Sequence, residues 1–282
     1  RIFPHKARQI DQALDQATSY AWNSFQNLQL LKNPDGTDTP VHQLVKRFID
    51  VPELLPAHVE KLEKVVGDIF TALLDPTLRK AKSDRFVVGR VIDGANSTFG
   101  FIVPMDKTKK IYLGERFFDP GFEHYRQHLS DTTFPIHTHA RAITLLHELS
   151  HIVCKTEDIS YLDPGRPFAD LIGTASATAI ALKDALTDVQ NTALAKETPY
   201  TRLFMTQDPD TGEWEDPGST TFEDTDRVRT HILALTGADN LAGARDIFKH
   251  NSLTRLAVQL GNADSVAWLI SHLGRELHVN TP

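Results

Sequence analysis

Two histidines and a glutamate lie close together in the pattern His147-Glu148-x-x-His151. On an α-helix, His147 and His151 are one turn apart on the same face, with Cβ atoms about 5–6 Å from each other. Two imidazoles at that separation can bind one zinc ion, whose bonds to histidine nitrogens are about 2.0–2.1 Å long. Glu148 lies about 100° further round the helix, where a carboxylate can take a proton from a water on the metal. The pattern therefore predicts a hydrolytic zinc site in which Glu148 is the general base.

A hydrolytic zinc site also needs a third protein ligand and an open position for water. The carboxylates that follow the pattern most closely are candidates: Glu157, Asp158 and Asp163. The next histidine in the chain is His231, so a third histidine close behind the pattern is excluded. A distant glutamate, such as Glu197 or Glu223, is an alternative. From the residues alone, the third ligand stays open.

The surrounding residues favour a metal over a chance occurrence of the pattern. With 13 histidines, a chain of this length would carry the pattern by chance in roughly a few per cent of cases. Here the pattern lies among apolar residues at helical positions, namely Ile143, Leu146, Leu149, Ile152 and Val153. Two imidazoles and a carboxylate in such a segment need partners, because buried polar groups without them are costly. A surface helix with incidental histidines is the weaker interpretation.

Apolar periodicity predicts helices on both sides of a small sheet. Residues that recur every three or four positions indicate helices near 6–32, 41–49, 59–74, 138–154, 168–189, 225–235, 240–249 and 252–276. Short β-rich runs indicate a small sheet within residues 85–118, and residues 206–226 have the composition of a long polar loop. This order favours an α+β fold over alternating βαβ units. The expected division is an N-terminal helical subdomain, residues 1–82, followed by a larger part, residues 83–282.

The sequence also predicts local structural roles for three residues. Thr138 is suited to cap the start of the histidine helix, which favours a helix cap over a second metal site at His137 and His139. Asn262 is suited to cap a new helix near the C-terminal end. Cys154 is expected to be a buried structural thiol.

Composition excludes several classes of protein. The chain has 282 residues, with 30 basic and 37 acidic side chains and a net charge of −7. This charge excludes a strongly basic binder of nucleic acids or of anionic membranes as the default. No apolar run approaches the roughly 18 residues that a membrane helix needs. The single cysteine excludes an internal disulfide and a cysteine-based zinc site, so histidines and carboxylates must hold any metal.

Three further segments carry recognisable patterns. Residues 156–161 have the sequence Thr-Glu-Asp-Ile-Ser-Tyr, which is similar to the Gly-Thr-x-Asp-x-x-Tyr-Gly motif of the aspzincins. That family includes deuterolysin and the lysine-specific metalloendopeptidases. Residues 111–118 resemble the strand and turn that precede the family's zinc helix, and residues 262–268 resemble its Asn-Ala-Asp helix near the C-terminus. The helices expected within residues 6–74 also fit the N-terminal half of the family.

The resemblance implies a zincin-like α+β fold with N-terminal helices, a small sheet, the histidine helix and an extended helical C-terminal part. It implies that Asp158 is the third ligand of one catalytic zinc ion, beside His147 and His151. Glu148 would be the general base, and the Tyr161 hydroxyl would stabilise the oxyanion. The expected function is a zinc-dependent endopeptidase that acts on a protein or peptide substrate. The alternative is a non-catalytic, zinc-stabilised domain that binds peptides or proteins.

The sequence also departs from the aspzincin pattern. Lys155 and Leu162 replace the first and last glycines of the motif, and Val266 replaces a tyrosine in the C-terminal segment. Residues 164–251 form an additional stretch, for which a cover over the cleft or a substrate-docking element is expected.

Two expectations concern substrate and location. A preference for lysine in the substrate would need a carboxylate near the site, for which Asp163 and Asp170 are candidates. The chain begins at Arg1 and has one cysteine, which favours the protease domain of a larger bacterial protein, or a toxin-like effector. Such a domain would be secreted or delivered into another cell.

Overall fold

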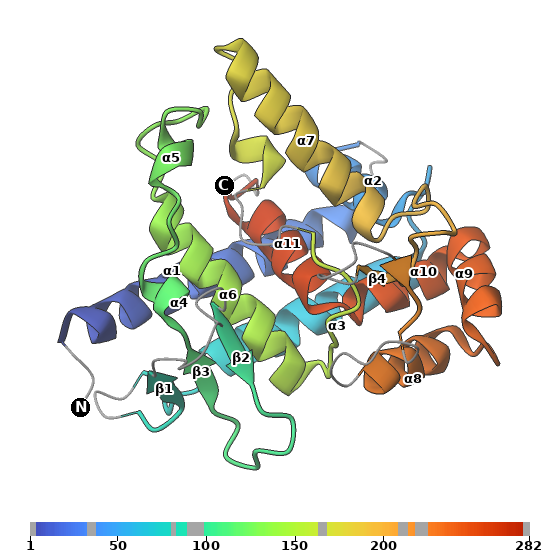
Figure 1. Ribbon diagram of the computed structural model, residues 1–282, viewed down its shortest axis with the longest axis horizontal. Helices are drawn as coiled ribbons and strands as arrows, with labels where there is room; N and C mark the ends of the chain where they lie inside the picture. Colours follow the sequence, from blue (N-terminus) through green and yellow to red (C-terminus); the bar gives the residue numbers. More distant parts are fainter. Residues whose placement is uncertain are drawn as a thin grey trace.

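Helices form most of the fold, and a three-stranded sheet lies to one side of them (Figure 1). The computed structural model describes residues 4–32, 38–79, 83–88, 99–162, 168–207, 214–217 and 225–278. Before the sheet come α1 (Pro4–Leu28), η1 (Gln29–Lys32), α2 (Pro40–Ile49) and α3 (Pro56–Leu73). After it come α4 (Glu115–Phe118), α5 (Glu123–Arg126), α6 (Ile136–Val153), η2 (Ala169–Leu171) and α7 (Ala177–Ala193). The remaining elements are β4 (Thr206–Gln207), β5 (Trp214–Glu215), α8 (Thr225–Thr236), α9 (Leu241–His250), α10 (Ser252–Leu260) and α11 (Ala263–Gly274). The predicted α+β class is confirmed.

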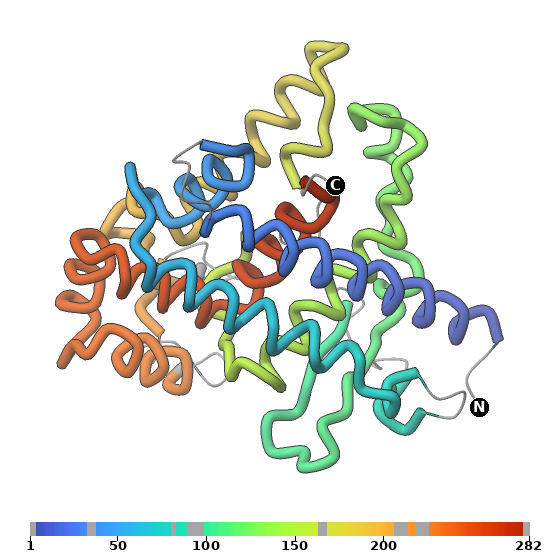
Figure 2. The backbone as a smooth tube through the Cα atoms, turned by 180° about the vertical axis from the view of Figure 1, so that it is seen from behind, coloured from blue at the N-terminus to red at the C-terminus, as the bar shows by residue number. Residues whose placement is uncertain are grey.

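The main hydrophobic core joins the first and last helices of the chain. α1 packs against α3, α6 and α11, and Figure 2 shows α1 and α3 crossing the back of the molecule side by side. Polar contacts reinforce the pairing of α1 with α11, because Ser24 Oγ donates to the Ile270 carbonyl at 2.7 Å and Asn27 Nδ2 to the Leu273 carbonyl at 2.6 Å. Residues on both sides of the boundary expected after residue 82 contribute to this core.

Gly274 allows a close approach of α1 to α11, because a Cβ there would lie 2.0 Å from the Tyr20 carbonyl oxygen. We expect Gly274→Ala to lower the free energy of unfolding by about 3 kcal/mol, since the backbone must move to relieve the overlap. Gly67→Ala in α3 is the matched control, because a Cβ there would lie 3.6 Å from the Phe25 ring, at ordinary contact distance. Urea unfolding should show the control unchanged or stabilised by up to about 1 kcal/mol. Equal effects of the two substitutions would contradict the prediction.

The sheet contains β1 (Phe86–Val88), β2 (Gly100–Ile102) and β3 (Ile111–Leu113), in the order β1-β3-β2. β3 runs parallel to β1 and antiparallel to β2. Ile111 and Leu113 are buried in the main core, whereas Tyr112 stacks on the exposed Phe101 of β2. The predicted sheet within residues 85–118 is confirmed, and β2 lies against α6.

Two segments differ from the prediction. The helix expected over 168–189 begins at Ala177, where the hydroxyl of the N-cap residue Ser176 accepts from the Ala179 N–H. Before it, η2 leads to Ile172, which forms a β-bridge with Leu129. The expected loop 206–226 contains the β4–β5 hairpin instead of being irregular over its described length.

Capping also differs at α6, which begins at Ile136 with Pro135 as its N-cap residue, so Thr138 is not the cap. His139 is buried and its Nδ1 lies 2.8 Å from the Tyr20 hydroxyl, which gives this histidine a structural partner.

Cys154 packs against the main core, and burial raises the pKa of its thiol to about 11. Within the described part of the chain, none of the helices is both apolar and long enough to cross a lipid bilayer.

Candidate metal centre

α6 presents two imidazoles to the carboxylate of Asp158, which follows the helix. His147 Nε2 lies 3.2 Å from His151 Nε2 and 3.1 Å from Asp158 Oδ1, and His151 Nε2 lies 3.5 Å from the same oxygen. A tetrahedral zinc ion with bonds of about 2.0–2.1 Å separates its ligand atoms by about 3.3 Å. The three atoms therefore have the spacing of one face of such a tetrahedron. Within the described ranges, this is the one cluster of at least three His, Cys, Asp or Glu residues that could hold a metal ion.

The hydrogen bonds of the two histidines explain why this cluster suits a cation. His147 Nδ1 lies 3.0 Å from Asp264 Oδ1, and His151 Nδ1 lies 2.8 Å from the carbonyl oxygen of Thr156. Both partners are acceptors, so the ring proton of each neutral histidine is assigned to Nδ1. Both Nε2 lone pairs then point toward Asp158 Oδ1. Three acceptors so close together repel one another unless a proton or a metal ion lies between them, so the donor set fits a metal cation such as zinc.

Electrostatics keep Asp158 in the form that binds metals. Burial would raise the pKa of its carboxyl group, but hydrogen bonds to His147 and His151 outweigh burial and hold the pKa far below its ordinary value. Burial lowers the pKa of His147, yet hydrogen bonds to Asp158 and Asp264 raise it well above its ordinary value. Asp158 is therefore ionised at neutral pH, and a proton competes with a metal ion for His147.

Asp158 belongs to the segment 155–162, which we call the ligand loop. The loop begins at Lys155, whose φ of 59° lies in the left-handed region that favours glycine. Lys155, at the position where the motif that residues 156–161 resemble has its first glycine, thus adopts a conformation typical of glycine. The Lys155 ammonium donates to the Ile152 carbonyl at 3.0 Å, in the last turn of α6. This left-handed residue turns the chain back toward the histidines.

The backbone of Lys155 gives a stability prediction. Lys155→Gly should leave the free energy of unfolding unchanged or raise it by up to about 1 kcal/mol, because glycine reaches positive φ without steric cost. Lys155→Val should lower it by about 1–2 kcal/mol, because a β-branched side chain is strained there. Thermal unfolding of the two variants beside the wild type would measure the difference. A valine variant as stable as the glycine variant would contradict the argument.

Asn262, at the junction of α10 and α11, holds the ligand loop. Its Oδ1 accepts from the backbone N–H groups of Ile159 at 3.0 Å and Ser160 at 3.1 Å, and its Nδ2 donates to the Ser160 carbonyl at 2.9 Å. The residue stands at the N-cap position of α11, as expected, but its side chain does not cap that helix. The buried amide instead fixes the backbone beside Asp158.

Asp264 connects the same helix to His147. One carboxylate oxygen accepts from His147 Nδ1, and the other accepts from the Leu162 N–H at 2.7 Å. The side chain therefore orients an imidazole of the candidate metal site and the end of the ligand loop together, as partners of metal ligands commonly do. This contact joins residues 117 positions apart in the chain, so spacing in the sequence cannot assign it.

Glu148 is buried on the side of α6 that faces β2. Its exposed fraction is 3%, and Oε2 has no hydrogen-bond partner among the described residues. Burial raises the pKa of its carboxyl group, and the neighbouring His147 and His151 oppose this shift. A Cβ at Gly100 would lie 3.2 Å from Glu148 Oε1, so the glycine leaves room for the carboxylate. A buried carboxylate with one oxygen free of described partners, beside a candidate metal site, is suited to exchange protons with a bound water or substrate.

Tyr161 lies next to the cluster with its ring parallel to the His147 ring. The ring centroids are 6.3 Å apart with an interplanar angle of 8°, and the tyrosine is 51% exposed. Burial, and then the negative charges of Asp158 and Asp264, raises the pKa of its hydroxyl group. The phenol therefore keeps its proton at neutral pH and can donate a hydrogen bond.

The other predicted carboxylates lie elsewhere or outside the described residues. Asp170 lies against the C-terminal end of α11, where it binds His272 at 3.0 Å and Arg275. Glu157 forms an ion pair with Arg227 and does not join the cluster. Glu197 is exposed beyond α7. Asp163 and Glu223 fall outside the described residues.

No protein-family model matches this chain, and searches of curated proteins and of solved structures found no match either. The geometry of the site must therefore support any functional conclusion.

Proposed function

We propose that this chain is a zinc-dependent endopeptidase with a zincin-like, aspzincin-type active site. The observation that carries the proposal is the triangle of His147, His151 and Asp158 acceptor atoms beside the buried Glu148, whose Oε2 has no hydrogen-bond partner among the described residues. A purely structural zinc site has a closed set of four protein ligands, whereas a catalytic site keeps a position open. Three ligands with an adjacent base favour catalysis.

The side chains around the cluster have complementary roles. A zinc ion held by the three ligands would polarise a substrate carbonyl and lower the pKa of a water toward about 7. Glu148, whose pKa is raised by burial, takes a proton from water and returns it to the leaving amine. Tyr161 stays protonated, so its hydroxyl group donates a hydrogen bond to the developing oxyanion. Asp264 keeps His147 in the tautomer that directs Nε2 at the metal.

The edge of the sheet offers a place for an extended substrate. Among the described residues, β2 pairs only with β3, so its other edge has backbone groups available. An extended peptide can add to such an edge by main-chain hydrogen bonds. Gly100 of β2 lies beside Glu148, so a peptide on this edge would pass close to the base. This arrangement supports a peptide as the substrate class.

A peptide-library digest read by mass spectrometry tests the proposal. Zinc-loaded wild type should cleave peptide bonds, whereas the chelator-treated protein and Glu148→Gln should not. The aligned cleavage sites would also establish whether lysine is preferred. One bound zinc per chain without any cleavage by the wild type would contradict the peptidase and favour the non-catalytic peptide-binding domain.

A further inference from the structure

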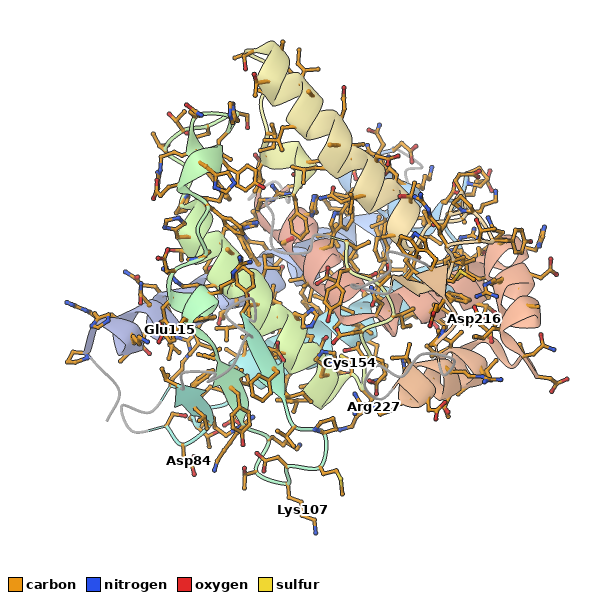
Figure 3. All side chains as sticks on the ribbon, viewed as in Figure 1. Asp84, Lys107, Glu115, Cys154, Asp216 and Arg227 are labelled. Carbon is orange, nitrogen blue, oxygen red and sulfur yellow. The ribbon has the colours of Figure 1, made fainter. Side chains whose placement is uncertain are left out.

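α8 contacts the ligand loop although it lies far from it in the sequence. Arg227 donates from Nε at 2.8 Å, and also from Nη2, to Glu157 Oε2, and Glu157 directly precedes the metal-binding Asp158. Figure 3 shows Arg227 near the C-terminal end of α6, which Cys154 marks. The exposed fractions of the two side chains are 42% for Arg227 and 16% for Glu157. The ion pair therefore reaches from α8 to the residue beside a predicted ligand.

Packing continues this contact on the next residues of the loop. Ile159 is 4% exposed and lies in the hydrophobic cluster of Leu203, Phe204 and Ile232, the last of which belongs to α8. The Ser160 hydroxyl donates to the Ala193 carbonyl at 3.1 Å, at the end of α7. The additional stretch 164–251 thus supplies contacts to both residues that follow Asp158.

Gly261 brings α8 and the ligand loop to one carbonyl group. Its oxygen accepts from the Glu157 N–H at 2.9 Å and lies 3.1 Å from His231 Nε2 on α8. A Cβ at Gly261 would lie 2.9 Å from the same imidazole nitrogen and 2.4 Å from Leu235 Cδ1. The absence of a side chain therefore permits α8 to approach the junction that also holds Asn262.

From these contacts we infer that α8 positions the third metal ligand, with Arg227 as the positioning residue that fixes the ligand loop through Glu157. The inference rests on the zinc site of the proposed function, but not on peptide cleavage. Within residues 164–251, the described contacts give α8 a role in supporting the candidate metal centre. The expected cover over the cleft, or substrate-docking element, stays a prediction for this stretch.

The positive charge of Arg227 makes electrostatic repulsion and a positioning role predict opposite effects of its removal on zinc binding. Arg227 is a cation near a proposed cation site, so simple Coulomb repulsion predicts that its removal strengthens zinc binding. A positioning role predicts the opposite, because a released loop no longer holds Asp158 against the two histidines. A partly exposed ion pair contributes little to folding, so Arg227→Met should not unfold the chain.

The experiment measures zinc affinity of the full chain by competition with a chromogenic chelator. We expect Arg227→Met to bind zinc about five-fold more weakly than wild type, which is less than the 10- to 100-fold typical of direct partners of metal ligands. Arg229→Met is the matched control, because Arg229 is exposed on the same helix and forms no ion pair within the described residues. The control removes the same charge and should bind zinc as tightly as wild type, or more tightly. Arg227→Lys keeps the charge without the forked donors, so its zinc affinity should lie between those of wild type and Arg227→Met.

A second measurement separates positioning from loss of fold. The unfolding temperature in excess chelator should be the same for wild type and Arg227→Met, whereas the increase on adding zinc should be smaller for the variant. Unchanged or stronger zinc binding by Arg227→Met would overturn the inference and leave the zinc site intact. Equal weakening by Arg229→Met would also overturn it. A wild type that binds no zinc would overturn both the inference and the proposed function.

Discussion

Glu148→Gln is expected to keep zinc bound and to lower kcat/KM for peptide cleavage by roughly 10³-fold or more, within the 10²–10⁴ typical of a lost general base. Glutamine has nearly the same shape as glutamate, so it fits beside Gly100, but it cannot accept a proton from water. The carboxylate is not one of the three metal-binding groups, so zinc affinity should change little.

The test combines steady-state cleavage of a fluorogenic peptide with a zinc titration of the same protein sample. Glu123→Gln is a suitable control, because Glu123 is an exposed glutamate on α5 that binds only Arg126 and His137 among the described residues. Its cleavage rate should equal that of wild type. Full activity of Glu148→Gln would exclude Glu148 as the base, whereas loss of zinc would give it a ligand role instead.

Asp158→Ala is expected to weaken zinc binding on the order of 10³-fold, which exceeds the 10- to 100-fold typical of an indirect partner. The substitution removes one of three acceptor atoms and the negative charge that faces both imidazoles. Cleavage should fall with zinc occupancy and recover partly at high zinc concentration.

Two comparison variants sharpen this prediction. Asp264→Asn keeps the shape of the partner of His147 and should weaken zinc binding only about 10-fold. Asp188→Ala, an exposed aspartate on α7, should have no effect. Full zinc affinity of Asp158→Ala would mean that another carboxylate is the third ligand.

The parts of the fold that follow from local pattern were predictable. α6 combines an apolar periodicity with the His147–His151 spacing. Neighbouring residues therefore predict both that the segment is helical and which face carries the two histidines. The expected triangle with Asp158 needed the resemblance of residues 156–161 as well, because spacing alone left several carboxylates open. The structure brings Asp158 to both histidines.

The parts that depend on distant contacts were not predictable. Asn262 has the side chain of a helix cap, but its amide binds Ile159 and Ser160, about a hundred residues earlier. The helix expected from residue 168 begins only at Ala177, because the preceding segment pairs with Leu129 instead. Local propensity cannot reveal either interaction, since both are tertiary contacts between residues far apart in the chain.

The pairing of α1 with α11 has a consequence for the order of assembly. Asn27 near one end of the chain donates to Leu273 near the other, so the main core closes only when segments of large sequence separation meet. α11 also carries Asp264, without which Nδ1 of His147 lacks its carboxylate partner. A growing polypeptide therefore possesses both histidines and Asp158 long before it can orient them. The direction of synthesis thus delays completion of the candidate metal site until residues 262–274 have joined the core.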